Sequence, residues 1–228
     1  MTPLPDITAR LAEVDGRIRA AAARAERDPT EVRLIAVSKA KPAELIRAAF
    51  AAGQRDFGEN YVQELVQKRG ALSDLEGIRW HFIGGLQRNK ARQVVDVALV
   101  QSVDRGELGV ELERRARAGG KRIDVLVEVN LGGEAQKSGC SPDVLPGLLD
   151  QLRALDALAV QGLMTVPPLD AEADRTRLLF RELARLRDRH REALGRGELS
   201  MGMSHDFEEA IEEGATLVRV GTAIFGAR

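Results

Sequence analysis

Eight short apolar segments occur at intervals along this chain, and each is followed by residues with a helical or short-helical pattern. Their length and β-branched content are typical of buried strands. The predicted strands cover 32–38, 55–58, 78–83, 98–102, 123–129, 158–165, 199–203 and 216–220. Consecutive parallel strands need a crossover, usually a helix, so this alternation predicts an α/β protein with a parallel sheet. Eight units favour a closed (β/α)8 barrel of the TIM type.

The alternative architecture is an open doubly wound sheet. No glycine-rich dinucleotide fingerprint follows the first predicted strand, and 228 residues shared among eight units leave no second domain. An amphipathic helix capped by Asp6 is predicted before the barrel. Its apolar positions are Ile7, Leu11, Val14, Ile18 and Ala25. We therefore expect a single domain over residues 1–228, a TIM barrel preceded by an N-terminal helix.

Charge and cysteine content exclude several classes of partner and site. With 34 Lys+Arg against 35 Asp+Glu, the formal net charge is −1, so no whole-chain field attracts nucleic acid or an anionic membrane. The chain has no apolar run of 18 residues and no secretory signal at its N-terminus. Cys140 is the only cysteine, which excludes an intrachain disulfide and is typical of a reducing compartment. We expect a cytoplasmic protein without nucleic-acid or membrane partners.

An arginine-rich segment at 175–191 has two interpretations. It holds seven arginines, which could contact phosphate groups. However, Leu179, Leu183 and Leu186 form an apolar stripe among them. A packed amphipathic helix with a solvated face explains all of these residues, so we favour it over phosphate binding.

Functional groups of a parallel barrel gather where strands end, and Lys39 follows the first predicted strand. It shares a face with Ile35 and Val37, so it points into the barrel mouth if those two residues fill the interior. An amine above an apolar layer is less readily protonated and forms a Schiff base with an aldehyde more readily. The alternative is a lysine whose ammonium group simply reaches solvent.

The last two predicted strands end in small residues before helix starts. Ser204, Gly221 and Thr222 offer backbone N–H groups and hydroxyls there. These groups predict a phosphate cup, defined by these three residues, where this fold commonly binds phosphate. A helix cap at Ser204 and a turn glycine at Gly221 are the alternatives, and a cap is compatible with phosphate binding.

Arg219 precedes Gly221 by two residues and shares a strand face with Leu217. This alternation directs it toward the barrel mouth, where a guanidinium group needs an acceptor. The alternative that we weigh against a ligand is a salt bridge with Glu128 or another strand carboxylate.

Three further polar residues are candidates for ligand contacts. Asn60 and His81 stand at or near the ends of neighbouring strands, where a helix cap and a buried, satisfied histidine are the alternatives. Lys137 lies in a glycine-containing loop and is a weak candidate for a second amine, because an exposed lysine is the more usual interpretation. With three histidines and no paired motif, we predict no metal site.

Five stretches of the sequence resemble the pyridoxal 5′-phosphate (PLP) homeostasis proteins, a family of PLP carriers related to the barrel domain of alanine racemase. They are AVSKAKP, FGENYVQE, WHFIGGLQRNK, GLMTVPP and LSMGMSHDFEEAIEEGATLVRVGTAIFGAR, which together span nearly the whole chain. The resemblance implies a barrel of the alanine racemase N-terminal-domain type and PLP as the cofactor.

The resemblance also implies a role for each candidate residue. These roles are an internal aldimine at Lys39, phosphate contacts from Ser204, Gly221 and Thr222, Arg219 facing the pyridine nitrogen, and Asn60 and His81 lining the cofactor. One PLP molecule would satisfy the lysine, phosphate and arginine interpretations together.

The same resemblance favours a carrier over a catalyst. A protonated pyridine nitrogen strengthens PLP as an electron sink, whereas Arg219 only donates and favours the unprotonated ring. Related racemases add a tyrosine as second base in a dimeric site with an extra β domain. Here the chain ends eight residues after Val220, and its only tyrosine is Tyr61. We expect a monomer without catalytic residues, which holds PLP as a Schiff base on Lys39 and supplies it to apo-enzymes.

Two enzyme classes remain as alternatives. One is a PLP-dependent racemase or related fold-type III enzyme that uses His81 or Tyr61 as its second base. The other is a Schiff-base aldolase acting on a phosphosugar, since that reaction also needs a lysine and a phosphate cup.

Overall fold

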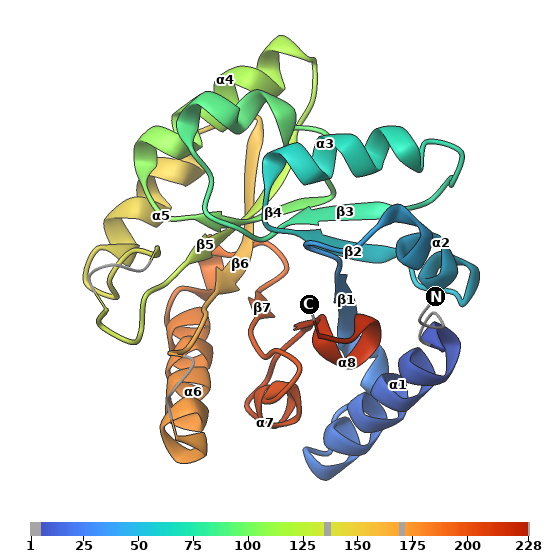
Figure 1. The fold of residues 1–228 in the computed structure, drawn as a ribbon. Helices are drawn as coiled ribbons and strands as arrows, with labels where there is room; N and C mark the ends of the chain where they lie inside the picture. Colours follow the sequence, from blue (N-terminus) through green and yellow to red (C-terminus); the bar gives the residue numbers. More distant parts are fainter. Residues whose placement is uncertain (1–5, 135–137, 169–171, 228) are drawn as a thin grey trace.

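The computed structural model describes residues 6–134, 138–168 and 172–227. Within these residues, eight parallel strands close into a barrel in sequence order, with β8 pairing β1 (Figure 1). The strands are β1 (Arg33–Val37), β2 (Asp56–Glu59), β3 (Arg79–Phe82), β4 (Leu99–Val103), β5 (Ile123–Glu128), β6 (Leu158–Met164), β7 (Glu198–Ser200) and β8 (Leu217–Val220). The predicted (β/α)8 barrel is confirmed.

Helices connect the strands and cover the outside of the barrel (Figure 1). They are α1 (Ile7–Arg24), α2 (Ala43–Ala51), α3 (Val62–Ala71), α4 (Gly106–Ala118), α5 (Leu145–Arg153), α6 (Ala173–Arg189), α7 (Phe207–Glu212) and α8 (Thr222–Phe225). Short 3-10 helices occur at η1 (Pro29–Glu31), η2 (Arg88–Gln93) and η3 (Arg191–Ala193). The helical segment expected after the third predicted strand is only the 3-10 helix η2, which buries Ala91 alone and so lacks the apolar stripe of an α-helix.

The predicted N-terminal helix is confirmed as α1. The Asp6 carboxylate accepts a hydrogen bond from the Ala9 amide at 3.0 Å, and the predicted Ile7, Leu11, Val14 and Ile18 are buried. The predicted apolar position Ala25 is instead the half-buried C-cap residue. Helix α1 lies against α7, where Arg17 and Glu208 form an ion pair at 2.7 Å. The first helix of the chain therefore packs beside its last ones.

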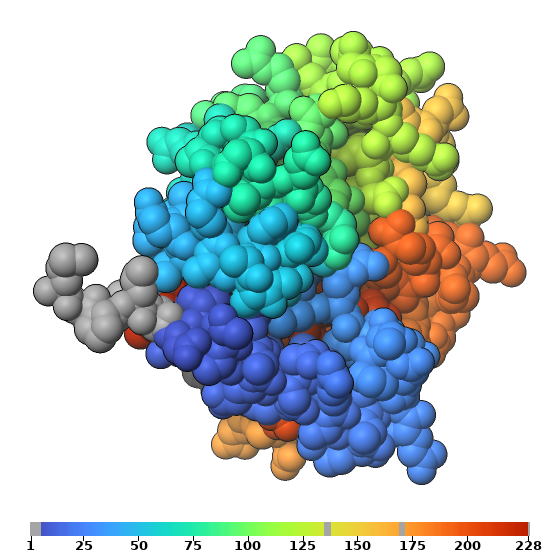
Figure 2. Space-filling model, turned by 90° about the vertical axis from the view of Figure 1, so that its right-hand side faces the viewer, coloured from blue at the N-terminus to red at the C-terminus, as the bar shows by residue number. Residues whose placement is uncertain are grey.

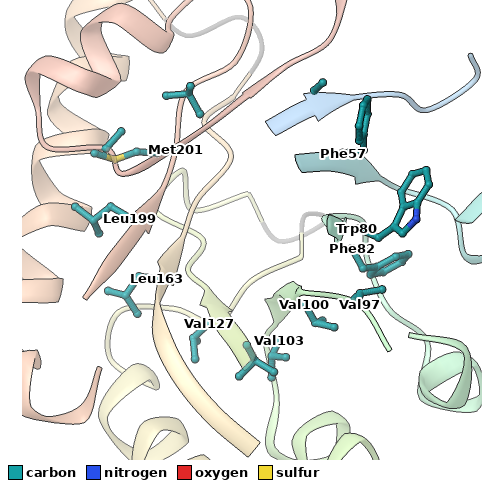
Figure 3. Close-up of a cluster of buried hydrophobic side chains, with 14 of the residues drawn as sticks. Phe57, Trp80, Phe82, Val97, Val100, Val103, Val127, Leu163, Leu199 and Met201 are labelled. Carbon is teal, nitrogen blue, oxygen red and sulfur yellow. The ribbon is translucent and has the colours of Figure 1, made fainter. Parts of the chain in front are cut away.

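Alternating residues of each strand face two different buried regions, one between the strands and the helices and one around the barrel axis. Residues that face the helices form the large apolar core, part of which Figure 3 shows around Phe57, Phe82 and Leu163. Residues that face the barrel axis form only a small apolar cluster of Ile35, Leu99, Leu126, Met164 and Leu217. The remaining axial positions carry buried polar groups, which gives the barrel a polar interior beside and above that cluster.

The arginine-rich segment forms α6 and packs as an amphipathic helix, as predicted. Leu183 and Leu186 of the predicted stripe are buried, but Leu179 is only half-buried, and Phe180 takes its place in the buried face. Arg177 and Arg181 form ion pairs with Glu212 and Glu213 beside α7, each at 2.8 Å. In the described ranges, no helix is long and apolar enough to cross a membrane.

Candidate functional site

The closed barrel brings most of the predicted site residues to one end. Lys39 follows β1, Asn60 follows β2 and Gly221 follows β8. Because β1 pairs with both β2 and β8, these residues lie at the carboxyl ends of adjacent strands. Ser204 lies in the loop after β7, and Thr222 is the first residue of α8.

The loops after β7 and β8 contact each other through the Ser204 hydroxyl. Its oxygen accepts hydrogen bonds from the Gly221 amide at 3.1 Å and the Ala223 amide at 3.5 Å. Ser204 therefore caps α8 from a neighbouring loop, whereas Asp206 precedes α7 as its N-cap residue. A Cβ atom at Gly221 would stand 3.2 Å from the Val37 carbonyl oxygen, so this turn lies close against β1.

Asn60 carries an unsatisfied polar atom. Its Oδ1 is buried and has no hydrogen-bond partner in the described part of the protein. Such an atom costs roughly 1–3 kcal/mol unless a ligand or water supplies a donor. A polar ligand in the barrel mouth therefore fits this position.

Replacing Gly84 with alanine is expected to displace Asn60. A Cβ atom at Gly84 would stand 2.1 Å from the Asn60 backbone oxygen, so the free energy of unfolding should fall by about 1–3 kcal/mol. Gly147→Ala is the control, since its Cβ would meet nothing within 4 Å in α5, and a helical alanine stabilises by about 0.5–1 kcal/mol. Urea unfolding measures both, and equal stabilities would contradict the predicted close contact.

The residue before Lys39 is held by buried polar contacts. Ser38 is fully buried, and its hydroxyl donates to Glu59 Oε1 at 2.6 Å. The Ser38 carbonyl accepts a hydrogen bond from Lys68 Nζ at 2.7 Å, and Lys68 also pairs with Glu59 at 2.7 Å. This triad of Ser38, Glu59 and Lys68 fixes the backbone on one side of Lys39.

The residue after Lys39 is held as well. Ala40 has a φ of 57°, in the left-handed region, and its amide donates to Glu64 Oε2 at 2.8 Å. Glu64 also pairs with Lys68 at 2.9 Å. The turn that presents the half-buried Lys39 is therefore fixed on both sides by α3. We did not predict the supporting contacts of Glu59, Glu64 and Lys68. The i,i+4 spacing of Glu64 and Lys68 could have indicated their ion pair.

The second lysine of this turn has a different environment. Lys41 Nζ donates to the carbonyl oxygens of Gly226 and Ala227 at 2.9 and 2.8 Å. These contacts hold its ammonium group near the C-terminal residues. Lys41 therefore links this turn to the residues that follow α8.

Arg219 is buried beneath the mouth and pairs with neutral acceptors. Its Nη1 donates to the Ser200 hydroxyl at 2.5 Å and its Nη2 to the Thr165 carbonyl at 2.9 Å. Among the described contacts there is no salt bridge to Glu128, whose charge acts only through space. Burial lowers the pKa of Arg219 to about 10, so the group stays protonated at neutral pH.

His81 lies on β3 inside the barrel, with 1% of its surface exposed. Its Nε2 lies 2.9 Å from Asp56 Oδ1, and its Nδ1 lies 3.1 Å from the Gln101 amide nitrogen. Burial opposes ionisation of Asp56, but hydrogen bonds from Arg79 and His81 outweigh it and lower the pKa of Asp56 to about 2. Both ring nitrogens of His81 thus contact the protein, and its contact with a cofactor stays a prediction.

Glu128 ends β5 and is buried near Arg219. Burial raises its pKa to about 7, the charge of Asp104 adds to this rise, and Arg219 opposes it. Between pH 4.5 and 7 the folded protein therefore retains a proton that the unfolded chain has released, so this group lowers stability as the pH rises.

A Glu128→Gln variant should isolate this effect. Relative to the variant, the wild type is expected to lose up to about 3 kcal/mol of unfolding free energy between pH 4 and 8. Urea unfolding of both proteins at the two pH values measures this difference. A constant difference would show that Glu128 titrates normally.

Lys137 lies outside the described residues. In the part of the chain that the structure covers, no group of three or more His, Cys, Asp or Glu side chains is placed to hold a metal ion.

Comparison with known proteins decides the family. Residues 10–228 match the alanine racemase N-terminal domain family. The pyridoxal phosphate homeostasis protein of Pseudomonas aeruginosa is 48% identical over 97% of this chain and 96% of its own length. The protein of the same name from Aquifex aeolicus is 46% identical over 96% and 97%. This chain belongs to the pyridoxal phosphate homeostasis protein family.

Solved structures agree with membership of the pyridoxal phosphate homeostasis protein family. PipY from Synechococcus elongatus, solved with PLP bound, is 41% identical with a TM-score of 0.84, over 96% of this chain and all of PipY. Alanine racemase from Streptomyces lavendulae is 22% identical with a TM-score of 0.68, and the match covers 58% of the racemase. The racemase therefore supports the barrel fold alone.

Proposed function

We propose that this protein binds PLP in the barrel mouth, holds it as a Schiff base on Lys39 and supplies it to PLP-dependent apo-enzymes in the cytoplasm. It does so as a monomer and without turning over an amino acid. One observation carries the proposal: a fixed lysine turn, the phosphate cup and a buried arginine meet at the carboxyl ends of adjacent strands. PLP bound to PipY, a close relative, supports the same ligand.

The residues present fit PLP. The phosphate cup supplies the hydroxyl groups of Ser204 and Thr222 at the start of α8, and the unsatisfied Oδ1 of Asn60 marks a polar contact after β2. Arg219 has N–H groups beyond the two that contact Ser200 and Thr165, and these can donate to a ring nitrogen. When bound, PLP supplies an electrophilic aldehyde and an electron-withdrawing ring.

Arg219 supports a role in storage rather than catalysis. A guanidinium donates hydrogen bonds and keeps its proton, so it stabilises an unprotonated pyridine nitrogen. Such a ring withdraws electrons weakly. Arg219 therefore limits the carbanion chemistry on which racemases depend.

The two candidates for a second base also support this role. Both nitrogens of His81 contact Asp56 and Gln101 inside the barrel. Tyr61 is 53% exposed, so its hydroxyl has no enclosed environment that would tune it for proton transfer. A racemase without a second base loses a contribution of about 10²–10⁴-fold.

The direct test is the absorbance spectrum of the purified protein, followed by borohydride reduction and peptide mapping. We expect visible absorbance and a reduced pyridoxyl group on the peptide that carries Lys39. Incubation with an apo-enzyme should restore the activity of that enzyme. A colourless protein that is inert to PLP would contradict the proposal and favour an aldolase.

The match to the alanine racemase N-terminal domain leaves a racemase as the alternative function. A measurement of amino-acid turnover distinguishes this racemase from a carrier. Deuterium exchange at Cα, measured for a panel of amino acids in D2O, should stay near the rate of free PLP. Robust exchange would refute the carrier role. Light scattering of the purified protein tests the proposed monomeric state.

A further inference from the structure

We propose that three side chains inside the barrel, Gln101, His81 and Asp56, are positioning residues that orient Ser200 and through it Arg219. This inference rests on the proposed function, because it assigns these residues a role toward PLP. We call the five residues, including Ser200 and Arg219, the interior chain.

The interior chain is continuous and buried. It joins five strands, β8, β7, β4, β3 and β2, in that order from Arg219 to Asp56. The Ser200 hydroxyl lies 2.6 Å from Gln101 Oε1, and the other links are the contacts of Arg219 and His81 given above. Each of the five side chains belongs to a residue at most 4% exposed. Water therefore has little access to compete for these bonds.

The two ends of the interior chain set the direction of every bond. Arg219 can only donate, so the Ser200 oxygen accepts from it, and the Ser200 proton needs an acceptor elsewhere. Gln101 Oε1 is that acceptor, which turns the Gln101 amide nitrogen toward His81 Nδ1. His81 Nδ1 must then lack a proton.

The opposite end requires the same state. Asp56 is ionised and only accepts, so His81 Nε2 carries the ring proton. Each of the four links then has one donor and one acceptor. Arg219 can only donate and Asp56 can only accept, whereas the three groups between them can do both. The four hydrogen bonds can therefore run in one direction only, from Arg219 toward Asp56.

The interior chain also connects the two ends of the barrel. Asp56 pairs with Arg79 at 2.5 Å, and both residues line a cavity of about 720 Å³ between α1 and the amino ends of β1, β2 and β3. In Figure 2, the dark blue atoms of α1 lie beside the lighter blue atoms of the segments that follow it in the sequence. Arg79 thus holds Asp56 ionised from the side opposite to the site.

The orientation of Ser200 matters because Arg219 has two fixed contacts, one on β7 and one on the residue that follows β6. Ser200 and the Thr165 carbonyl hold Nη1 and Nη2, and together they set the plane of the guanidinium group. Without Gln101, the Ser200 proton loses its acceptor, and the hydroxyl can rotate toward Arg219. The arginine would then meet a donor instead of an acceptor.

A Gln101→Leu variant tests the interior chain. We expect PLP binding to weaken about tenfold, the equivalent of about 1.4 kcal/mol, and the pH dependence of the bound chromophore to shift. Gln161→Leu is the matched control, because that strand amide bonds to Asp124 outside the interior chain. Unchanged PLP binding and spectrum in Gln101→Leu, or equal changes in both variants, would overturn the proposal.

Nitrogen NMR of His81 in the wild-type protein gives a second test that needs neither a variant nor PLP. The expected result is a neutral ring with its proton on Nε2. A proton on Nδ1 would overturn the proposal even if PLP binds. If the tautomer is as expected but the wild type does not bind PLP, the proposed function fails and, with it, the role of the interior chain toward PLP.

Discussion

Lys39→Ala protein is expected to lose all covalently bound PLP. The turn that carries Lys39 is fixed on both sides through Ser38 and Ala40, and the ammonium group of the neighbouring Lys41 is held by two carbonyl oxygens. Borohydride reduction followed by intact mass measurement should find the pyridoxyl increment in the wild type and not in the variant.

Lys41→Ala is the matched control for this prediction, because it removes the neighbouring amine from the same turn. It should keep the full increment. Reversible binding of PLP to Lys39→Ala should persist at reduced affinity, since the phosphate cup and Arg219 remain. A pyridoxyl group retained by the Lys39→Ala protein would refute the assignment of Lys39.

Lys68→Met is expected to lower the free energy of unfolding by about 3–5 kcal/mol. The substitution leaves Glu59 buried without its cation, and Glu59 Oε2 already has no partner in the described structure. The Ser38 carbonyl also loses its donor. Urea unfolding measures the change.

The control for this prediction is an exposed ion pair of similar length. Arg19 pairs with Asp15 at 2.8 Å, with side chains 69% and 54% exposed, so Arg19→Met should cost less than about 1 kcal/mol. Adding Glu59→Gln to Lys68→Met should recover part of the loss, because it removes the uncompensated charge. Equal costs for the two single variants would show that burial does not strengthen the Lys68 contacts.

The barrel was predictable because its strands and helices leave local periodic patterns. The position of Lys39 and Gly221 at the same end of the barrel was predictable as well, because a parallel barrel brings the carboxyl ends of its strands together. The helical segment expected after the third predicted strand was the exception. It buries Ala91 alone, so no apolar stripe favours an α-helix there.

The supporting contacts were not predictable from spacing. The Ser200 and Gln101 side chains are 99 positions apart, and Lys68 reaches a carbonyl 30 positions away. Charge complementarity suggested a carboxylate partner for Arg219. The structure instead gives it the hydroxyl of the adjacent strand, because β7 pairs with β8 next to Ser200. Such choices depend on register and side-chain rotamers, which no local pattern encodes.

The contact of α1 with α7 has a consequence for synthesis on the ribosome. Arg17 and its partner Glu208 are 191 positions apart, and β1 has four register pairs with β8. While the chain is being translated, the open edge of β1 therefore has no neighbour on that side until residues near 220 have left the exit tunnel. An unpaired edge strand readily associates with other chains. The first strand of a nascent copy therefore stays exposed to such association until β8 has been synthesised and has left the exit tunnel.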